Sequence, residues 1–433
     1  MKKILFANIP GHGHFNPLTG LAAYLKNQGH DVRWYAGAIH HKKLEELSIP
    51  VFPFKKAYDI DPSRVDVIFP ERTRITNQVK KLRFDLRNIF ILRATEFYED
   101  IREIDAVFPF DLLICDISFT ALPFVKEKMK RPVFSIGIFP VMETSRDLPP
   151  YGLAMTPTYT ALGKVKQNFF KFLADRVLFK ESNDHFRKIL REHNIDAKRN
   201  IFDTAYEKST LVLQNGTPGF EYKRSDWGKN IRFMGPLFPP PKKHSGSLSF
   251  RQKLKGFDKV ILVTQGTVEQ DVNKIIVPTL EAFKNTNHLI IATTGGSLTR
   301  ELKARFPGRN MIVEDFIPFD DVMPHCDVYI TNGGFGGVMY GIKHKLPLVV
   351  AGVHEGKNEI NARVGYLKLG VNLGTETPTA VQISNAVEKI IRDKTFKENV
   401  TSLSLEFEKY QPGPLLEQYV SQIADQDLQL ATR

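Results

Sequence analysis

The sequence predicts an α/β protein with two domains, each built on a parallel sheet covered by helices. Short β-branched runs alternate with amphipathic helical patterns along the whole chain, which is typical of sheets made from strand-helix-strand units. The 433 residues also exceed the length at which one hydrophobic core keeps growing. We therefore expect two domains of about 200 residues each.

The expected strands form two series separated by a linker. The first series covers residues 3–9, 32–35, 112–115 and 133–137, and the second covers 260–264, 289–293, 311–314, 328–331 and 348–351. The segment between them is rich in proline, glycine and serine, which interrupt helices and strands. The expected units are an N-terminal domain over 1–235, a linker over 236–250, a C-terminal domain over 251–411, and a last helix over 412–433 that packs back on the N-terminal domain.

The composition indicates a cytoplasmic globular protein. Hydrophobic residues make up 42% and charged residues 25%, and no apolar run reaches the ~20 residues that span a bilayer. Cys115 and Cys326 each lie in an apolar strand, so a disulfide framework is not expected and a reducing compartment fits. No stable membrane insertion is expected, and the sequence carries no indication of the oligomeric state.

The net charge of +12 raises the possibility of nucleic-acid binding. The basic residues are scattered in short groups without interleaved stacking aromatics, so a solvated surface is the favoured interpretation and no nucleic-acid partner is expected. A basic nucleotide- or nucleic-acid-binding protein without transfer activity remains the alternative outside the enzymes.

Residues 164–180 form an amphipathic stretch with phenylalanines and lysines interleaved. Such a helix could rest on a membrane surface. The favoured interpretation is a helix that buries one apolar stripe in the first domain.

The first candidate site follows the first strand, where residues 10–17 read PGHGHFNP. His12 and His14 lie on a glycine-rich turn, and Asn16 followed by Pro17 is a good helix start. Ligands bind open α/β sheets at the carboxyl ends of the strands. A neutral histidine there can take a proton from a hydroxyl group.

A second strand end supplies a carboxylate, because Asp116 follows the strand at 112–115. Aspartate rarely sits at the tip of a core strand without a partner. A hydrogen bond from one ring nitrogen of His14 to Asp116 would orient the imidazole and stabilise its protonated form. No nucleophilic serine or cysteine has a matching context, so the pair favours base catalysis.

Glycine-rich turns follow three strands of the second half. The turn after 328–331 contains Asn332, Gly334, Gly336 and Gly337 and opens a helix. Similar turns lie at residues 264–267 and 293–297. Free backbone N–H groups and the positive end of a helix bind diphosphates, so these turns predict a nucleotide site.

Asp59 and Asp61 have the spacing of a two-carboxylate metal site. They lie in a proline-flanked loop without further ligands, so a solvated turn is favoured. We expect no metal.

The segments 11–17 and 313–361, in this order, resemble the family 1 nucleotide-sugar glycosyltransferases of the GT-B fold. The resemblance covers essentially the whole chain. It implies two Rossmann-like domains whose parallel sheets face a central cleft, with the acceptor in the first domain and the donor in the second. It also implies that His14 is the acceptor-activating base and Asp116 its partner. The nucleotide sugar is a co-substrate, and no cofactor is implied.

The resemblance also assigns donor contacts. Phe316 takes the place of the aromatic residue that stacks on the nucleotide base, and the backbone of Ile317 is implied to pair with the base edge. The implied diphosphate contacts lie in the glycine-rich turns and are Thr267, Asn332, Gly336 and Gly337, with Gly334 in the same turn.

The sequence departs from the family pattern in the second half. Asn332 stands where histidine is common, and Tyr340 stands where plant members carry a glutamate that clasps both ribose hydroxyls. The acidic residue and glutamine that usually hold glucose are replaced by Lys357 and Asn358. These departures suit a deoxyribose, hence a thymidine diphosphate donor, and put glucose in doubt.

Within the family, residues 31–35, 216–222 and 331–337 resemble the bacterial flavonoid rhamnosyltransferases. That resemblance implies inverting transfer of rhamnose from dTDP-rhamnose to a hydroxyl of a flavonoid or similar aromatic acceptor. Candidate acceptor contacts come from the phenylalanine-rich first half and are Phe84, Phe119, Phe139 and Met142. The alternatives are a UDP-glucose-dependent enzyme with the same acceptors and a lipid or carotenoid glycosyltransferase.

Overall fold

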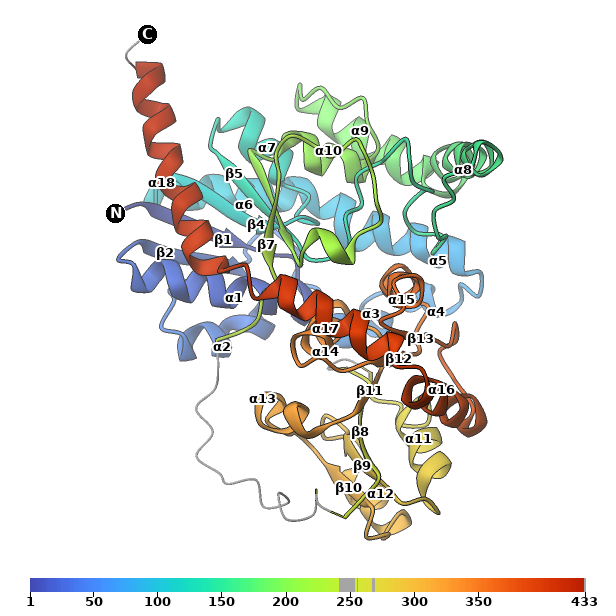
Figure 1. Cartoon of the computed structure of the whole chain (residues 1–433). Coiled ribbons are helices and arrows are strands. Elements are labelled where there is room, and N and C mark those ends of the chain that lie inside the picture. The colour runs from blue at the N-terminus through green and yellow to red at the C-terminus, as the bar shows by residue number, and fades with distance from the viewer. Residues whose placement is uncertain (241–253, 255, 267–268, 432–433) are drawn as a thin grey trace.

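The computed structural model contains two parallel sheets, one in each half of the chain (Figure 1). It describes residues 1–240, 254, 256–266 and 269–431, without the side chains of 424–431. Within these residues the first sheet has seven strands in the order β3-β2-β1-β4-β5-β6-β7, and the second has six in the order β10-β9-β8-β11-β12-β13. Neighbouring strands in each sheet are parallel. The predicted α/β class with two parallel sheets is confirmed.

The strands of the first sheet are β1 Lys3–Ala7, β2 Asp31–Ala36, β3 Val51–Pro53, β4 Leu112–Asp116, β5 Val133–Gly137, β6 Leu211–Asn215 and β7 Ile231–Gly235. Those of the second sheet are β8 Lys259–Thr264, β9 His288–Thr293, β10 Met311–Glu314, β11 Val328–Thr331, β12 Leu348–Val350 and β13 Gly370–Asn372. The expected strands are all present, with small shifts at their ends. The sequence missed β3, β6, β7 and β13. Three of these are edge strands that are only partly buried, so they lack the continuous apolar run of a central strand.

The helices of the first half are α1 His12–Asn27, α2 His41–Glu46, α3 Val65–Ile68, α4 Pro70–Thr73, α5 Gln78–Asp85, α6 Ala94–Val107, α7 Leu122–Lys128, α8 Ala161–Leu173, α9 Lys180–Glu192 and α10 Ile201–Lys208. Those of the second half are α11 Ile276–Phe283, α12 Thr299–Arg305, α13 Phe319–Val322, α14 Phe335–Lys343, α15 Lys357–Tyr366, α16 Ala380–Arg392, α17 Thr395–Phe407 and α18 Pro412–Ala431. None of the described helices is long and apolar enough to cross a membrane.

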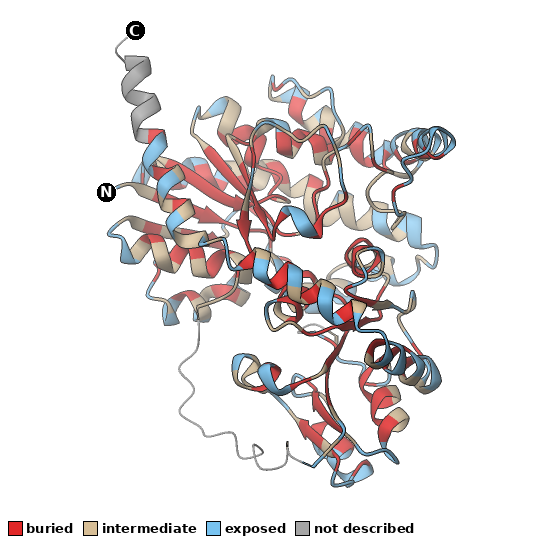
Figure 2. Ribbon diagram, in the orientation of Figure 1, coloured by how far each residue is buried: buried red, intermediate tan, exposed pale blue. Residues whose placement is uncertain are grey.

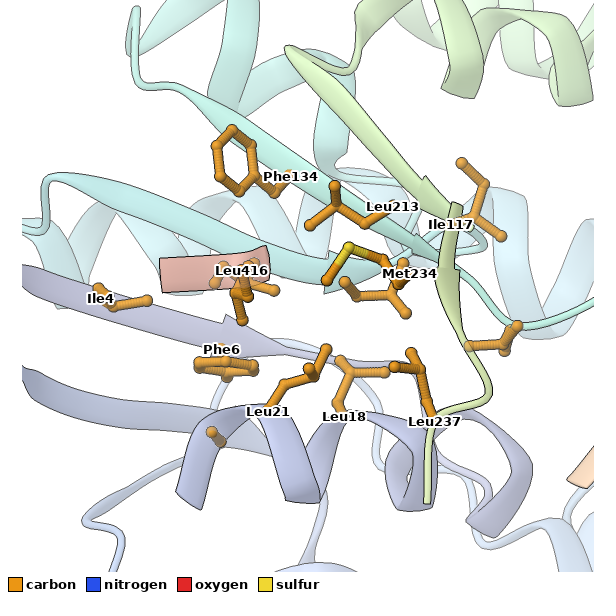
Figure 3. Packing of buried hydrophobic residues seen from close by; sticks show 14 of the residues in the cluster. Ile4, Phe6, Leu18, Leu21, Ile117, Phe134, Leu213, Met234, Leu237 and Leu416 are labelled. Carbon is orange, nitrogen blue, oxygen red and sulfur yellow. The ribbon is translucent and has the colours of Figure 1, made fainter. Parts of the chain in front are cut away.

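The central strands are buried on both faces because helices cover both sides of each sheet (Figure 2). Along β1, Phe6 points into a cluster with residues of α1, whereas Leu5 points into a second cluster with residues of α6. Figure 3 shows Phe6 with Leu18 and Leu21 of α1 in the first of these clusters. The sheet therefore holds the carboxyl ends of its strands in fixed positions.

The last helix of the chain lies against the first sheet rather than the second. Leu416, Val420 and Ile423 of α18 are buried in the same cluster as Leu18 and Leu21 of α1. Figures 1 and 3 show this contact between the two ends of the chain.

One helix begins earlier than the sequence predicted. The start expected at Asn16 and Pro17 is wrong, since α1 begins at His12 and contains Pro17. Gly11, with φ 140°, turns the chain directly after β1, and its carbonyl accepts the N–H groups of His14 and Phe15. His14 therefore lies in the first turn of a helix, where its direction is fixed by the backbone.

The expected orientation of the stretch at 164–180 is also wrong. The buried positions of α8 are Gly163 and Gln167, whereas Leu162, Phe169 and Phe172 are exposed. The Gln167 side chain accepts the Thr158 N–H at 2.6 Å and donates to the Asp147 carbonyl at 3.1 Å. These polar bonds anchor the helix, so its apolar stripe faces outward.

Candidate active site

The structure brings His14 and Asp116 together at the carboxyl ends of β1 and β4. His14 Nδ1 lies 3.0 Å from Asp116 Oδ1, with the carboxylate fully buried and the imidazole 16% exposed. The carboxylate also accepts the backbone N–H of Ile9 at 3.1 Å and of Ser118 at 2.9 Å. A carboxylate accepts hydrogen bonds, so Nδ1 of His14 carries the proton and Nε2 has a free lone pair. The ring is therefore oriented to accept a proton at Nε2.

Aromatic rings flank this histidine. The ring centroid of Phe139 lies 5.7 Å from that of His14, and Phe90 lies at 6.5 Å. A Cβ atom at Gly11 would lie 3.2 Å from His14 Cδ2, and φ at Gly11 is positive, so glycine permits this close packing. The surroundings of His14 are thus apolar on the sides that carry Phe90 and Phe139.

A buried histidine that the sequence did not single out supports the same turn. His40 stacks on Phe15 with centroids 4.1 Å apart, and its Nε2 accepts the Gly11 N–H at 3.4 Å. Burial, and then the neighbouring histidines His12, His14 and His41, lower the pKa of His40 to about 3. His40 is therefore neutral at physiological pH and able to accept that hydrogen bond. No sequence pattern marks it, because its contacts come from tertiary packing.

The four acceptor candidates lie in different environments. Phe139 adjoins His14, as described above. Phe84 of α5 contacts Phe69 at 5.7 Å. Phe119 is buried between Tyr35 and Phe97. Met142 is buried in the cluster that also contains Phe6 and residues of α1. The protein itself thus covers the side chains of Phe119 and Met142.

In the second half, the polar turns lie along one edge because β9, β8 and β11 are neighbours in the sheet. The Asn332 amide donates to the Gln265 carbonyl in the turn after β8, and its oxygen accepts the Gly334 N–H at 3.2 Å. The side chain of Asn332 therefore ties two turns together. Thr267, the remaining candidate of the turn after β8, lies outside the described residues.

The turn after β11 is shaped by glycines. Gly333 has φ 80°, and a Cβ atom there would lie 1.7 Å from Asn361 Oδ1. Gly336 and Gly337 lie in the first turn of α14, whose N–H groups have no partner within the helix. A Cβ atom at Gly336 would meet nothing within 4 Å. This turn presents backbone N–H groups beside open space.

Phe316 follows β10 and is 77% exposed, whereas Ile317 packs partly into the core below it. The neighbouring Asp315 carbonyl accepts the Thr293 hydroxyl at 2.9 Å and the Gly295 N–H at 2.9 Å. These bonds connect the turns after β9 and β10. An exposed ring on an anchored turn is available to stack on a planar ligand.

The three residues at which the sequence departs most clearly from the family pattern contact other groups of the protein. Tyr340 packs on Phe238 with centroids 4.3 Å apart, and Lys357 forms an ion pair with Glu355. The Asn358 amide donates to the Gly152 carbonyl at 3.2 Å, across to the first half of the chain. Asn358 therefore connects the two halves.

A buried ion network joins the same surfaces and was not predicted. Glu359 Oε1 accepts the N–H groups of Gly152 at 2.8 Å and Ala154 at 2.7 Å. Arg363 lies 3.1 Å from Glu359 Oε2 and 3.2 Å from Glu221 Oε2, and all three side chains are nearly fully buried. The i,i+4 spacing of Glu359 and Arg363 is visible in the sequence, but nothing there places Glu221 beside them.

The two aspartates with metal-like spacing both bond to the backbone. Asp59 accepts the Ala38 N–H at 2.7 Å, and Asp61 accepts the Ser63 N–H at 2.9 Å. In the described part of the chain, no group of three or more histidine, cysteine, aspartate or glutamate side chains has the arrangement of a metal site.

Two parallel sheets covered by helices are the architecture of the GT-B fold. The fold matches a solved structure described as the glycotransferase of kitacinnamycin, with a TM-score of 0.75, 18% identity, and coverage of 98% of this chain and 99% of that one. The family described as "UDP-glucoronosyl and UDP-glucosyl transferase" matches residues 160–420, and the chain belongs to it.

Curated relatives align over nearly the full length. The 4'-demethylrebeccamycin synthase of Lentzea aerocolonigenes is 31% identical over 94% of this chain and 95% of the relative. UDP-glycosyltransferase 2 of Phaeomoniella chlamydospora is 27% identical over 94% of this chain and 92% of the relative. The protein is therefore a glycosyltransferase, which removes the non-enzyme alternative.

Proposed function

We propose that this protein is an inverting O-glycosyltransferase that moves rhamnose from dTDP-rhamnose to a hydroxyl of a flavonoid or similar small aromatic acceptor. The observation that carries the proposed transfer chemistry is the 3.0 Å contact between His14 Nδ1 and the buried Asp116 carboxylate. In this proposal residues 1–235 and helix α18 form the acceptor side and 251–411 the donor side, whereas most of the linker expected at 236–250 lies outside the described residues.

The proposed reaction is a single displacement. His14 Nε2 takes the acceptor hydroxyl proton as that oxygen attacks the anomeric carbon. The bond from the anomeric carbon to the diphosphate oxygen breaks, and its electron pair leaves with the nucleoside diphosphate. Asp116 stabilises the imidazolium, and attack opposite the leaving group inverts the anomeric carbon.

The leaving group is proposed to rest on the glycine-rich turn before α14. The free N–H groups around Gly336 and Gly337 and the positive end of the helix suit the growing charge on the diphosphate, without a metal. Phe316 is the proposed stacking partner of the nucleotide base, with the Ile317 backbone at the base edge. In this scheme Asn332 holds two turns in a fixed position relative to each other, because its amide is already bonded to the Gln265 carbonyl.

The proposed donor rests on side chains at three positions. Tyr340 offers no carboxylate for two ribose hydroxyls and packs on Phe238. Lys357 and Asn358 are engaged with Glu355 and Gly152. The Lys357 and Asn358 side chains are thus already engaged within the protein, which suits a sugar with fewer hydroxyls, such as a 6-deoxyhexose. The name of the Phaeomoniella relative, a UDP-glycosyltransferase, favours a uridine diphosphate sugar as the alternative donor, and UDP-glucose is the one we test.

The aromatic acceptor is supported by the rings of Phe90 and Phe139, which both lie near His14. The test is product analysis by mass spectrometry with quercetin as acceptor. dTDP-rhamnose and UDP-glucose are offered in parallel, with and without a chelator. A rhamnosyl product that resists the chelator is expected. A glucosyl product alone overturns the donor proposal, and no product with either donor overturns the acceptor class.

His14→Ala is the matched control for the reaction. It should form no product while its equilibrium affinity for thymidine diphosphate stays close to that of the wild type. Equal losses of transfer and nucleotide affinity would contradict the role of His14 as base.

A further inference from the structure

An apolar stripe on α8 and the segment after it faces away from the protein. We call it the α8 patch, and its members share exposure between 37% and 84%: Leu162, Val165, Phe169, Phe172, Leu173 and Val177. Successive members on α8 are mainly three or four residues apart, so they lie on one side of the helix. Figure 1 shows α8 at the periphery of the first half of the molecule. Clustered large apolar side chains at a surface mark an interaction site more often than isolated ones.

The orientation of the α8 patch is set by specific bonds on the opposite side of the helix. Gln167 is 2% exposed and bonds to Thr158 and Asp147. The Lys171 ammonium donates to the Ser145 carbonyl at 2.6 Å. Rotation of the helix to bury its phenylalanines would break these bonds, so the exposure is built into the fold.

A neighbouring helix extends the surface. Arg83 of α5 donates to the Leu178 carbonyl at 3.0 Å, just beyond the α8 patch. Val79, one turn before Arg83 on the same face, and Leu82 are about 40% exposed. The helix α5 continues through residues 86–90 to Phe90, whose ring lies beside His14. The surface is therefore contiguous in the chain with the proposed acceptor side.

The charges around the patch have mainly one sign. Residues 78–85 and 161–178 contain seven lysines and arginines against two aspartates. Both aspartates have partners, Asp85 with Arg72 and Asp175 with Asn183. An apolar stripe flanked by basic side chains matches the headgroup region of an anionic bilayer. A second copy of this chain would bring like charges together.

We propose that the α8 patch docks the enzyme on the surface of a membrane rich in anionic phospholipid, with α8 lying in the headgroup plane. The phenylalanines enter the acyl boundary, and Lys164 and Lys166 contact the lipid phosphates. This docking goes beyond the proposed transfer reaction and does not depend on the identity of donor or acceptor. It directs the acceptor side of the enzyme toward the membrane, where apolar acceptors concentrate.

The test is sedimentation of the full-length protein with vesicles. Vesicles of phosphatidylcholine alone are compared with vesicles that also contain phosphatidylglycerol, at low and at physiological ionic strength. The wild type should bind the anionic vesicles and release them as salt rises. Phe169→Ser with Phe172→Ser should weaken binding at least about tenfold, because two large apolar side chains are lost. Lys164→Gln and Lys166→Gln should each weaken it about fivefold.

A matched control carries the same kind of change elsewhere. Val381→Ser with Leu405→Ser replaces exposed apolar residues of α16 and α17 and should bind vesicles as the wild type does. Thermal unfolding of each variant checks the fold. Equal vesicle binding by the wild type and the Phe169/Phe172 variant overturns the proposal, as does absence of binding by the wild type. A dimer in gel filtration that this variant dissociates would instead identify the patch as a self-association surface.

Discussion

The two sheets present their candidate sites by different means. At the end of the first sheet, one side chain holds another, and the Asp116 carboxylate accepts three N–H groups, one of them from His14. At the end of the second sheet, backbone N–H groups and glycines shape the turn, and the Asn332 side chain is already bonded within the protein. Proton transfer needs a particular titratable group, whereas a diphosphate can be held by any backbone that adopts the right turn. Substitutions at the two sites should therefore fail in different ways.

The largest effect on the reaction rate is expected for a substitution at the end of the first sheet. Asp116→Asn keeps the shape of the side chain but places an amide N–H opposite a backbone N–H or the His14 ring. We expect kcat to fall about 10³- to 10⁴-fold, because the imidazole loses its orientation and its counter-charge. The affinity for thymidine diphosphate, measured by calorimetry, should not change.

The double variant sharpens this test. Asp116 is proposed to act through His14, so His14→Ala combined with Asp116→Asn should be no slower than His14→Ala alone. If the rate losses of the two single variants instead multiplied in the double variant, Asp116 would contribute independently of His14, which would contradict its positioning role.

A smaller effect is expected at the second sheet. There a substitution of Gly333 should affect the stability of the fold, and one of Gly336 should affect nucleotide binding. Gly333→Ala introduces a Cβ atom 1.7 Å from Asn361 Oδ1 at φ 80°, and we expect the free energy of unfolding to fall by about 1–3 kcal/mol. Gly336→Ala meets open space in a helix, so stability should stay equal or rise by up to about 1 kcal/mol. Denaturant unfolding measures both changes.

Nucleotide binding then distinguishes the roles of these glycines. The new methyl group of Gly336→Ala would stand at the proposed diphosphate position, so affinity for thymidine diphosphate should decrease although the fold is intact. Unchanged affinity in this variant would remove the first turn of α14 from the donor site.

The sequence was sufficient for features that depend on local pattern. The central strands, the carboxylate at the tip of β4 and the glycine turns after β8, β9 and β11 can be predicted because each has its own local signal. The orientation of α8 could not, since amphipathicity shows that a helix has an apolar side but not which way that side points. The network of Glu221, Arg363 and Glu359 also escaped prediction, because it joins residues more than 130 positions apart and depends on how the two halves meet.

The last expected effect concerns His40, which supports the turn of the first site. Its pKa of about 3 in the folded protein is below the 6.5 of a free histidine, so between these values the unfolded chain binds a proton that the folded protein does not. The free energy of unfolding should therefore fall as pH falls through this window, with His40 contributing at most about 1.4 kcal/mol per pH unit. His40→Gln can still accept the Gly11 N–H but does not titrate, and its unfolding free energy should depend less steeply on pH than that of the wild type. Denaturant unfolding across this pH range compares the two slopes, and parallel curves would mean that His40 takes up its proton in the folded state.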